Sequence, residues 1–347
     1  MTPTSGHDSP PAEVLLAFGL TQPRCERITS GHINQTWRLS PAKRSAPRES
    51  FVLQHVNPLF PPEVQHDIVA VTAHLRSLGV RTIELLETRT GEPFYLRHGE
   101  IWRLTRFIQG ATIDRVEHPW QAREAGRLLG EFHTALRSFP GRLGLTRPGV
   151  HDLPAHLQRL EAALAAHRQH RHYVEIERIA ARIVEAAAEV RDHPPTEPVL
   201  VHGDPKISNV IFDRHAAVCL IDLDTLGVMP VELEIADALR SWCNPEAEDS
   251  PQANCSAALF RAACEGYAHI DRELALTLPD VTAQIAVELA ARFCADALAE
   301  SYFGWDASRF ETASAHNKAR CDAQLALAAD ILGQRPQLRS MLLELAR

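Results

Sequence analysis

The chain has 347 residues, 45% of them apolar, and a formal net charge of -8. This length suggests about two domains or lobes, and the apolar content is sufficient for a sizeable core. The negative charge argues against nucleic acid as the main partner, because a phosphate backbone is bound by basic surfaces.

The cysteines and the apolar runs indicate the compartment. The seven cysteines are scattered singly, without a C-x-x-C pair, which is typical of reduced thiols in a cytosolic chain and does not predict a zinc site. The polar N-terminus does not resemble a secretory signal, and no apolar run approaches the roughly twenty residues of a membrane span. We therefore expect a cytoplasmic protein without a membrane partner.

The N-terminal part of the chain predicts a tail, two helices and a set of strands. Residues 1–11 are rich in Pro, Ser and Thr and are predicted to be disordered. A short helix is predicted over 12–18, and a longer one that begins with proline over 62–78. Short runs rich in apolar residues predict strands over 27–30, 32–39, 51–56, 80–87, 94–96 and 101–108.

From residue 109 onward, apolar residues recur at helical spacing on both sides of one exceptional segment. Helices are predicted over 117–138, 152–166, 173–191, 252–270, 281–303, 307–332 and 337–346. His133 lies on the apolar side of the first of these helices, and we interpret it as a core histidine. The pattern as a whole predicts an α+β fold with a small β lobe and a larger, mainly helical lobe.

The exceptional segment is residues 199–225, VLVHGDPKISNVIFDRHAAVCLIDLDT. An apolar strand leads into a polar loop, and the loop leads into a predicted hairpin of two further strands. Asp204 and Asn209 have four residues between them, and Lys206 follows Asp204 by two. Asp222 comes directly after the second strand of the hairpin. This is the order H-x-D-x-x-x-x-N followed by a metal-binding Asp, which kinases use.

Phosphoryl transfer explains why these residue types occur together. One carboxylate must orient the attacking hydroxyl and accept its proton, a role that fits Asp204. Oxygen ligands must hold magnesium, which fits Asn209 and Asp222, and a cation such as Lys206 supports the transferred phosphoryl group. A polar turn with solvated carboxylates is the alternative, but the flanking strands and the second Asp favour an ATP- and magnesium-dependent phosphotransferase.

The loop HGDPKISN followed by IDLDT resembles the aminoglycoside-phosphotransferase superfamily, which shares the protein-kinase fold. Other stretches are similar to its N-acetylhexosamine 1-kinase branch: GHINQTW at 31–37, FVLQHVN at 51–57, IWRLTRFIQGAT at 101–112, and a tail from ARF at 291–293 through SYF to HNKAR at 316–320. The resemblance spans nearly the whole chain. It implies a two-lobed fold with ATP and magnesium between lobe 12–108 and lobe 109–347.

The resemblance also implies a nucleotide site in the small lobe. Its residues are Ser30, Gly31, His32, Asn34, Gln54, Phe107 and Ile108. Backbone amides of the turn at Gly31 would cover the ATP phosphates, because glycine permits close approach. Taken alone, that turn fits an ordinary hairpin equally well. The strand that ends at Phe107 and Ile108 is the expected hinge, where backbone groups meet adenine.

Gln54 departs from the protein-kinase pattern, in which a strand Lys pairs with the ATP phosphates. Gln54 can donate a hydrogen bond but carries no charge. The related sugar kinases accept Gln here, so the departure does not by itself predict an inactive protein. It leaves open which group offsets the charge of the α and β phosphates.

The residues after the hairpin provide support and candidates for the acceptor site. We expect Asp237 to support the catalytic loop through its backbone, and Arg240 to pair with Asp237 within one helix or to face the substrate. Asp224 is expected either to bind a second metal or to hydrogen-bond nearby groups. The candidates for the acceptor site are Asp224, Arg240, Arg292, Tyr302 and Asn317.

The favoured function is phosphorylation of a hydroxyl on a small molecule, a sugar such as an N-acetylhexosamine at its anomeric position. Kinases of aminoglycosides, choline or homoserine are alternatives within the class. A nucleotide-binding pseudokinase with a regulatory role is the alternative of another class, favoured by Gln54 and opposed by the complete set of Asp204, Asn209 and Asp222.

Overall fold

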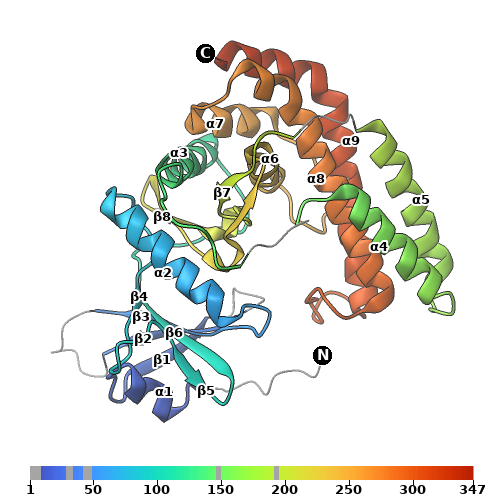
Figure 1. The fold of residues 1–347 in the computed structure, drawn as a ribbon. Coiled ribbons are helices and arrows are strands. Elements are labelled where there is room, and N and C mark those ends of the chain that lie inside the picture. Colours follow the sequence, from blue (N-terminus) through green and yellow to red (C-terminus); the bar gives the residue numbers. More distant parts are fainter. Residues whose placement is uncertain (1–8, 29–33, 42–48, 146–149, 191–194, 347) are drawn as a thin grey trace.

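The computed structural model describes residues 9–28, 34–41, 49–145, 150–190 and 195–346. The chain forms a small β lobe and a larger helical lobe, with the blue sheet apart from the green, yellow and red helices (Figure 1). The small lobe contains a six-stranded antiparallel sheet in the order β1-β2-β3-β6-β4, with β5 also paired to β6. Its elements are α1 (Ala12–Ala17), β1 (Arg24–Ile28), β2 (Gln35–Ser40), β3 (Phe51–His55), α2 (Pro62–Ser77), β4 (Leu85–Leu86), β5 (Tyr95–Arg97) and β6 (Glu100–Arg106).

One face of this sheet is closed by its own core. Trp37 and Leu39 on β2 alternate with more exposed neighbours, as side chains of a strand point to opposite faces. They pack with Leu53 of β3 and Trp102 of β6, and the rings of Trp37 and Trp102 are stacked at 5.6 Å. Helix α1 covers this cluster with Val14. The opposite face of β6 therefore remains for other contacts.

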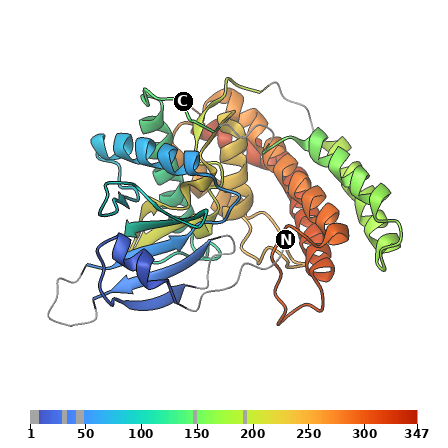
Figure 2. The ribbon, with the colours of Figure 1, turned by 60° about the horizontal axis from the view of Figure 1, so that its bottom comes forward.

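Helix α2 connects the two lobes by packing. Its buried residues Val64, Ile68, Val71 and Leu75 recur at intervals of four, three and four, which places them on one side of the helix. They belong to the same apolar cluster as the helices of the large lobe. A second view shows α2 beside the yellow hairpin (Figure 2). The small lobe is therefore fixed to the large lobe by a helix as well as by the connecting chain.

The large lobe is helical around two short antiparallel sheets. Its helices are α3 (Pro119–Leu136), α4 (Leu153–Ala166), α5 (Tyr173–Glu189), α6 (Val231–Trp242), α7 (Ala257–Tyr267), α8 (Arg272–Ala299) and α9 (Ala313–Leu345). Strand β7 (Val199–Val201) pairs with β10 (Gly227–Met229), and β8 (Val210–Asp213) forms a hairpin with β9 (Ala216–Leu220). The predicted hairpin is confirmed, whereas β10 was not predicted.

The main differences from the predicted elements concern the C-terminal helices. Helix α8 begins earlier than predicted, because the Asp271 side chain accepts from Leu274 N (2.8 Å) and Pro279 lies within the helix. The two helices predicted over 307–332 and 337–346 are one helix, α9, which passes through Pro336. Proline removes one intrahelical hydrogen bond. Packing of α8 and α9 along each other outweighs that loss in both helices (Figure 1).

Helix α8 is long and apolar enough to cross a membrane by length and composition. In the structure, the rest of the chain buries 72% of the most apolar 18-residue stretch of α8. Helices α4, α5, α6 and α9 all contact it. We therefore interpret α8 as the central core helix of the large lobe.

Glycines allow α3 and α7 to approach closely. A Cβ on Gly126 of α3 would lie 2.1 Å from Ala263 O, and a Cβ on Gly266 of α7 would lie 1.9 Å from Arg123 O. Both distances are far below van der Waals contact. The two helix backbones therefore touch at these glycines, and their spacing depends on the missing side chains.

We predict that Gly126→Ala destabilises the protein by about 1–3 kcal/mol, the usual cost of overpacking a core. Gly333→Ala is the matched control, since Gly333 lies in α9 and its Cβ would meet nothing within 4 Å. Alanine has the higher helix propensity, so the control should be neutral or slightly stabilising. Thermal unfolding of both variants checks this, and equal melting temperatures would contradict the close contact.

Candidate active site

The polar loop 202–209 crosses close to the chain before β10, and Gly203 permits the crossing. Gly203 has φ +86°, and a Cβ there would lie 2.0 Å from Thr225 O. His202 is fully buried beneath the loop and its Nε2 donates to Ile221 O (2.9 Å), while its Nδ1 accepts from Asp204 N (3.3 Å). Burial lowers the pKa of His202. A neutral imidazole, with one donor and one acceptor nitrogen, fits both contacts.

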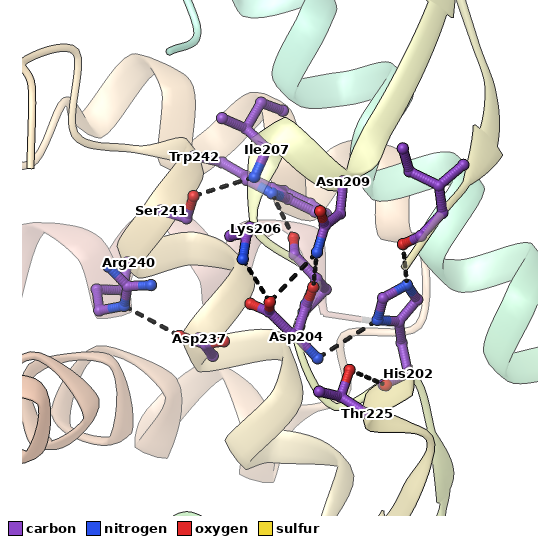
Figure 3. A network of polar contacts seen from close by, with 12 residues as sticks. His202, Asp204, Lys206, Ile207, Asn209, Thr225, Asp237, Arg240, Ser241 and Trp242 are labelled. Carbon is purple, nitrogen blue, oxygen red and sulfur yellow. Dashed lines mark hydrogen bonds and ion pairs between the residues drawn. The ribbon is translucent and has the colours of Figure 1, made fainter. Parts of the chain in front are cut away.

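Asp204, Lys206 and Asn209 are brought together by this loop, as the sequence predicted (Figure 3). Lys206 Nζ donates to Asp204 Oδ2 (2.6 Å). Asn209 Nδ2 donates to the Asp204 backbone oxygen (2.9 Å) and to Oδ2 (3.3 Å). Burial opposes the charge of Lys206, but Asp204 and Asp222 outweigh it and raise the pKa of Lys206. The lysine is therefore held as a cation beside the Asp204 carboxylate.

Helix α6 supports the loop 202–209 by hydrogen bonds, but not through Asp237, the residue that was predicted to do so. Gly203 N donates to the buried Glu234 carboxylate (2.6 Å), whose other oxygen contacts His133. Ser241 Oγ accepts from Ile207 N (3.1 Å), and Trp242 Nε1 donates to the Pro205 backbone oxygen (2.8 Å). These contacts fix both ends of the loop to one helix.

The expectation that Asp237 supports the loop backbone is therefore wrong. Asp237 lies one turn beyond Glu234, near the same side of the helix and close to the loop, but its carboxylate is paired within the helix (Figure 3). It accepts from Arg240 Nε (3.0 Å), and both side chains are largely buried. Burial alone would raise the pKa of Asp237, but the positive charge of Arg240 lowers it. The predicted intrahelical pair of Asp237 and Arg240 is thus present.

His133 and Glu234 are two buried polar residues in contact, of which the sequence identified only the first. His133 is buried, and its Nδ1 contacts Tyr267 OH (2.9 Å) while Nε2 contacts Glu234. It is a satisfied core histidine, as predicted. Glu234 was missed because VELEIADALR contains several acids, and only the register of the helix decides which one meets the loop.

Asp222 and Asp224 are separated by one residue in the chain, but their surroundings differ. Burial and the neighbouring Asp224 raise the pKa of Asp222 to about 6. Burial would also raise the pKa of Asp224, but the Arg103 charge and its hydrogen bonds lower it. Asp222 adopts a left-handed backbone conformation (φ 66°), which turns the chain sharply after β9. A cation beside Asp222 would relieve the cost of its negative charge.

The partner of Asp224 is Arg103 on β6, which sequence reasoning missed. Arg103 Nη2 donates to Asp224 Oδ2 (2.8 Å), and Nη1 donates to Oδ1. Asn34 Nδ2 also donates to Asp224 Oδ2 (2.8 Å). Of the two roles considered for Asp224, the structure thus provides hydrogen bonding to nearby groups. A charged residue in the middle of an apolar strand is the signal that could have found Arg103.

Gln54 is also engaged by protein groups, contrary to the expected contact with a phosphate. Its Oε1 accepts from Arg103 Nε (2.9 Å), and its Nε2 donates to Thr36 Oγ1 (3.4 Å). Gln54 and Arg103 are direct partners in the pairing of β3 with β6. Gln54 therefore positions Arg103. The positive charge is carried by Arg103 on β6, the strand next to β3, and not by β3 itself.

Three of the predicted nucleotide residues, Ser30, Gly31 and His32, lie outside the described residues. Asn34 is described and joins the lobes, because its Oδ1 accepts from Asn57 N (2.8 Å) while its Nδ2 reaches Asp224.

Phe107 and Ile108, the expected hinge, lie on the chain that leads out of β6 toward the large lobe, and their contact with adenine stays a prediction. The guanidinium of Arg38 lies 4.1 Å from the centre of the Phe107 ring. Ile108 packs against the core of the large lobe. Directly after Gly110, Ala111 exchanges two backbone hydrogen bonds with Phe212 of β8 (2.9 and 2.8 Å). The connecting chain is therefore attached to the β8–β9 hairpin.

The predicted acceptor residues in the tail differ in their surroundings. Asn317 is fully buried and donates to Asp296 Oδ2 (3.0 Å), so it supports the turn after α8 and does not reach an open site. Tyr302 is 63% exposed, and the guanidinium of Arg292 lies 5.6 Å from the centre of the Phe303 ring. The loop that carries Tyr302 is fixed by its own backbone, since Tyr302 N donates to Asp296.

Among the described residues there is no group of three or more His, Cys, Asp or Glu side chains that could hold a metal ion. Asp222 and the amide oxygen of Asn209 offer one carboxylate and one neutral oxygen. Magnesium commonly takes one or two protein carboxylates and completes its octahedron with water and substrate phosphates. The donor set therefore fits magnesium that arrives with a nucleotide, and does not fit a site formed by protein alone.

A small antiparallel lobe joined to a helical lobe, with Asp204, Asn209 and Asp222 at one loop and hairpin, defines a kinase-like protein. Residues 24–273 match the phosphotransferase enzyme family, and this range is well over half of the chain. The chain belongs to the phosphotransferase enzyme family. The prediction of a phosphotransferase is thereby confirmed.

Solved structures with the same fold cover nearly the whole chain. An aminoglycoside phosphotransferase from Alicyclobacillus acidocaldarius has a TM-score of 0.63 at 17% identity, over 96% of this chain and 98% of that one. A microcompartment-associated aminopropanol kinase has 0.62 at 15%, over 93% and 97%. A choline kinase from Cryptosporidium parvum has 0.57 at 11%, over 93% and 92%. This likeness confirms the two-lobed α+β fold, whereas the N-acetylhexosamine 1-kinase branch stays a prediction.

The contacts of Glu234 predict how the catalytic loop responds to mutation. Glu234→Ala leaves a buried N–H of Gly203 without an acceptor, which costs about 1–3 kcal/mol. We expect a lower melting temperature and a lower kcat. Glu234→Gln keeps an oxygen that can accept from Gly203, so it should recover part of both losses. If the Gln and Ala variants were equally impaired, the hydrogen bond to Gly203 would not be the important contact.

Proposed function

We propose that the protein is an ATP- and magnesium-dependent kinase that phosphorylates a hydroxyl group of a small molecule. The observation that supports this most directly is the convergence of Lys206 and Asn209 on the Asp204 carboxylate, with Asp222 close by. In this proposal Asp204 orients the acceptor hydroxyl and takes its proton. Lys206 stabilises the charge of the phosphoryl group in transfer, because a fixed cation acts strongly where water is excluded.

Asn209 and Asp222 would hold the magnesium ion. Because the Asn209 amide nitrogen already donates to Asp204, its amide oxygen is available as a ligand. Magnesium would supply charge neutralisation along the phosphates.

The nucleotide is proposed to bind between lobe 12–108 and lobe 109–347. The boundary at 108 follows the chain out of β6, although α2 shares the core of the large lobe. A spectinomycin phosphotransferase with a similar fold was solved with ADP and spectinomycin, and an amicoumacin kinase with AMP-PNP and Ca²⁺. These neighbours support ATP as the donor. The proposed compartment is the cytoplasm, where ATP is abundant and single cysteines remain reduced.

For the acceptor we propose a neutral sugar, with an N-acetylhexosamine phosphorylated at its anomeric hydroxyl as the favoured case. Two acids near Lys206 and Arg240 are already paired with arginines: Asp237 with Arg240 (3.0 Å) and Glu248 with Arg320 (3.5 Å). A cationic acceptor would be favoured by unmatched acids. Matched pairs offer donors and acceptors for hydroxyl groups without a large net charge, which supports a polyhydroxylated acceptor.

The amine-bearing acceptors remain the second candidate within the class. The fold is shared with kinases named for aminoglycosides, choline and aminopropanol. A pseudokinase is less well supported, because Asp204, Lys206 and Asn209 are held together in one loop with Asp222 close by, a set that a regulatory module does not need.

Incubation with ATP, magnesium and a panel of acceptors, read by product mass, tests the function. We expect phosphorylation of an N-acetylhexosamine in preference to aminoglycosides, choline and homoserine. In Asp204→Asn the proton acceptor is lost while the shape is kept, so turnover should fall roughly 10²- to 10⁴-fold with little change in ATP affinity. Preference for a cationic acceptor would contradict the sugar assignment. Undiminished turnover by Asp204→Asn would contradict the catalytic role.

The magnesium response tests Asp222 and Asn209 separately from Asp204. Asp222→Ala should raise the magnesium concentration needed for half-maximal activity, because a hard cation loses its carboxylate ligand. Asn209→Ala should do so more mildly, since a neutral amide oxygen is the weaker ligand. Asp213→Ala, on the exposed end of the same hairpin, is a control that should titrate like the parent. Parent-like titration by both site variants would exclude this metal site.

A further inference from the structure

The side chain of Arg103 is almost completely withdrawn from solvent. It is 1% exposed, and its partner carboxylate on Asp224 is 0% exposed. Buried arginines are rare unless they are paired, so this one requires an explanation from its contacts. Arg103 lies on the face of β6 opposite to Trp102 and Leu104, and those two belong to the core closed by α1. The guanidinium therefore faces the large lobe.

The contacts of Arg103 come from three different elements of the fold. Its Nε donates to Gln54 of β3 (2.9 Å), and its Nη1 donates to Gln65 of α2 (2.9 Å). Both Nη atoms donate to Asp224, which lies in the short 3₁₀ turn Leu223–Thr225 directly after Asp222. A planar guanidinium meets a carboxylate with two parallel bonds, which fixes orientation as well as distance.

These contacts exclude a direct role for Arg103 at a phosphate. All three guanidinium nitrogens donate to protein oxygens, and the positive charge is matched by Asp224. Reaching a phosphate would require breaking the buried ion pair and leaving Asp224 unpaired, which is strongly unfavourable. Arg103 can therefore influence the nucleotide only through the groups that it holds.

We propose that Arg103 is a positioning residue that couples the small lobe to the metal-binding Asp222, in place of the strand Lys that Gln54 replaces. Arg103 grips Asp224, and the intervening Leu223 is fully buried, so the carboxylate of Asp222 is held at a fixed place relative to β6 and α2. Asp224 is the anchor of this coupling and not a second metal ligand. The inference rests on the proposed function, because it assigns a metal to Asp222.

The coupling has a second attachment that does not involve arginine. Asn34, directly before β2, donates to the same Asp224 oxygen (2.8 Å) and accepts from the N–H of Asn57, two residues after β3 ends (2.8 Å). Asp224 thus receives donors from two places in the small lobe, the middle of β6 and the segment before β2. A displacement of the small lobe would therefore move the segment that carries Asp222.

The test measures binding of a non-hydrolysable ATP analogue by calorimetry, with and without magnesium, so that it does not depend on turnover. Arg103→Met should raise the magnesium concentration for half-maximal binding roughly tenfold or more, the scale of a lost charge-assisted hydrogen bond. Binding of the analogue without metal should change less than about twofold. Arg103→Lys keeps the charge but loses the two parallel bonds, so it should be intermediate.

A double variant keeps the test valid if Arg103→Met fails to fold. Arg103→Met leaves Asp224 buried and unpaired, whereas Arg103→Met with Asp224→Asn removes both charges, which proteins tolerate far better. The double variant should recover thermal stability but not the magnesium response, and its loss should be no greater than that of the worse single variant. Recovery of the parent's magnesium response by the double variant would overturn the proposal. Tighter magnesium binding in Arg103→Met would overturn it as well.

Two controls separate this inference from the proposed function. Arg106→Met removes an arginine from the same strand, but Arg106 is half exposed and pairs with Glu49 and Glu84 at the surface, so its magnesium response should match the parent. Asp222→Ala reports on the metal site itself. If Asp222→Ala loses the response and the Arg103 variants keep it, only the coupling is wrong. If Asp222→Ala keeps it, the metal assignment fails first.

Discussion

A buried ion pair between Arg103 of the sheet and Asp224 of the turn after β9 joins the two lobes of this protein. Both charges are withdrawn from water, and the desolvation of two ions is costly. The geometry compensates, because every guanidinium nitrogen and both carboxylate oxygens have partners. Such a pair adds little net stability compared with apolar residues of the same size. What it provides is a defined position for one lobe against the other.

The catalytic loop depends on a separate set of contacts that lie entirely within the large lobe. Glu234, Ser241 and Trp242 of α6 hold Gly203, Ile207 and Pro205. The contacts that support Asp204 and Lys206 thus lie within the large lobe, whereas the segment of Asp222 is joined to both lobes through Asp224. The site thus consists of a part held within the large lobe, which is proposed to carry the proton acceptor, and a part in contact with both lobes, which is proposed to carry the metal.

The sequence predicted the parts of the site that are local in the chain. The spacing of Asp204, Lys206 and Asn209 places them together because one loop of the backbone carries all three. The hairpin and the helix α2 were predicted for the same reason, since their patterns are contained in short segments. Long-range partners were not predicted. Nothing in the local pattern around Gln54 shows that Arg103 will lie beside it, because strand pairing decides that.

Register was the second limit on what could be predicted. Asp237 and Glu234 are both acids on α6, and a shift of three residues changes which one meets the loop. The boundaries of the C-terminal helices α8 and α9 were predicted wrongly for another reason. Pro279 and Pro336 normally mark helix boundaries, but a long antiparallel packing of α8 against α9 maintains the helix through both. Asn317 was assigned to an acceptor site by resemblance, and its burial against Asp296 could be known only from the packing.

The bridge between Ala111 and Phe212 has a mechanical consequence for the whole molecule. Because it fixes the connecting chain to β8 immediately after Gly110, the free length between the lobes is short, from Phe107 to Gly110. Gly110 has φ +139°, and a Cβ there would lie 2.5 Å from Phe212 O, so the chain passes against the hairpin without a side chain. A rotation of the small lobe would therefore turn about a point beside the β8–β9 hairpin. Residues near this point would move little, and residues at the far edge of the sheet would move most.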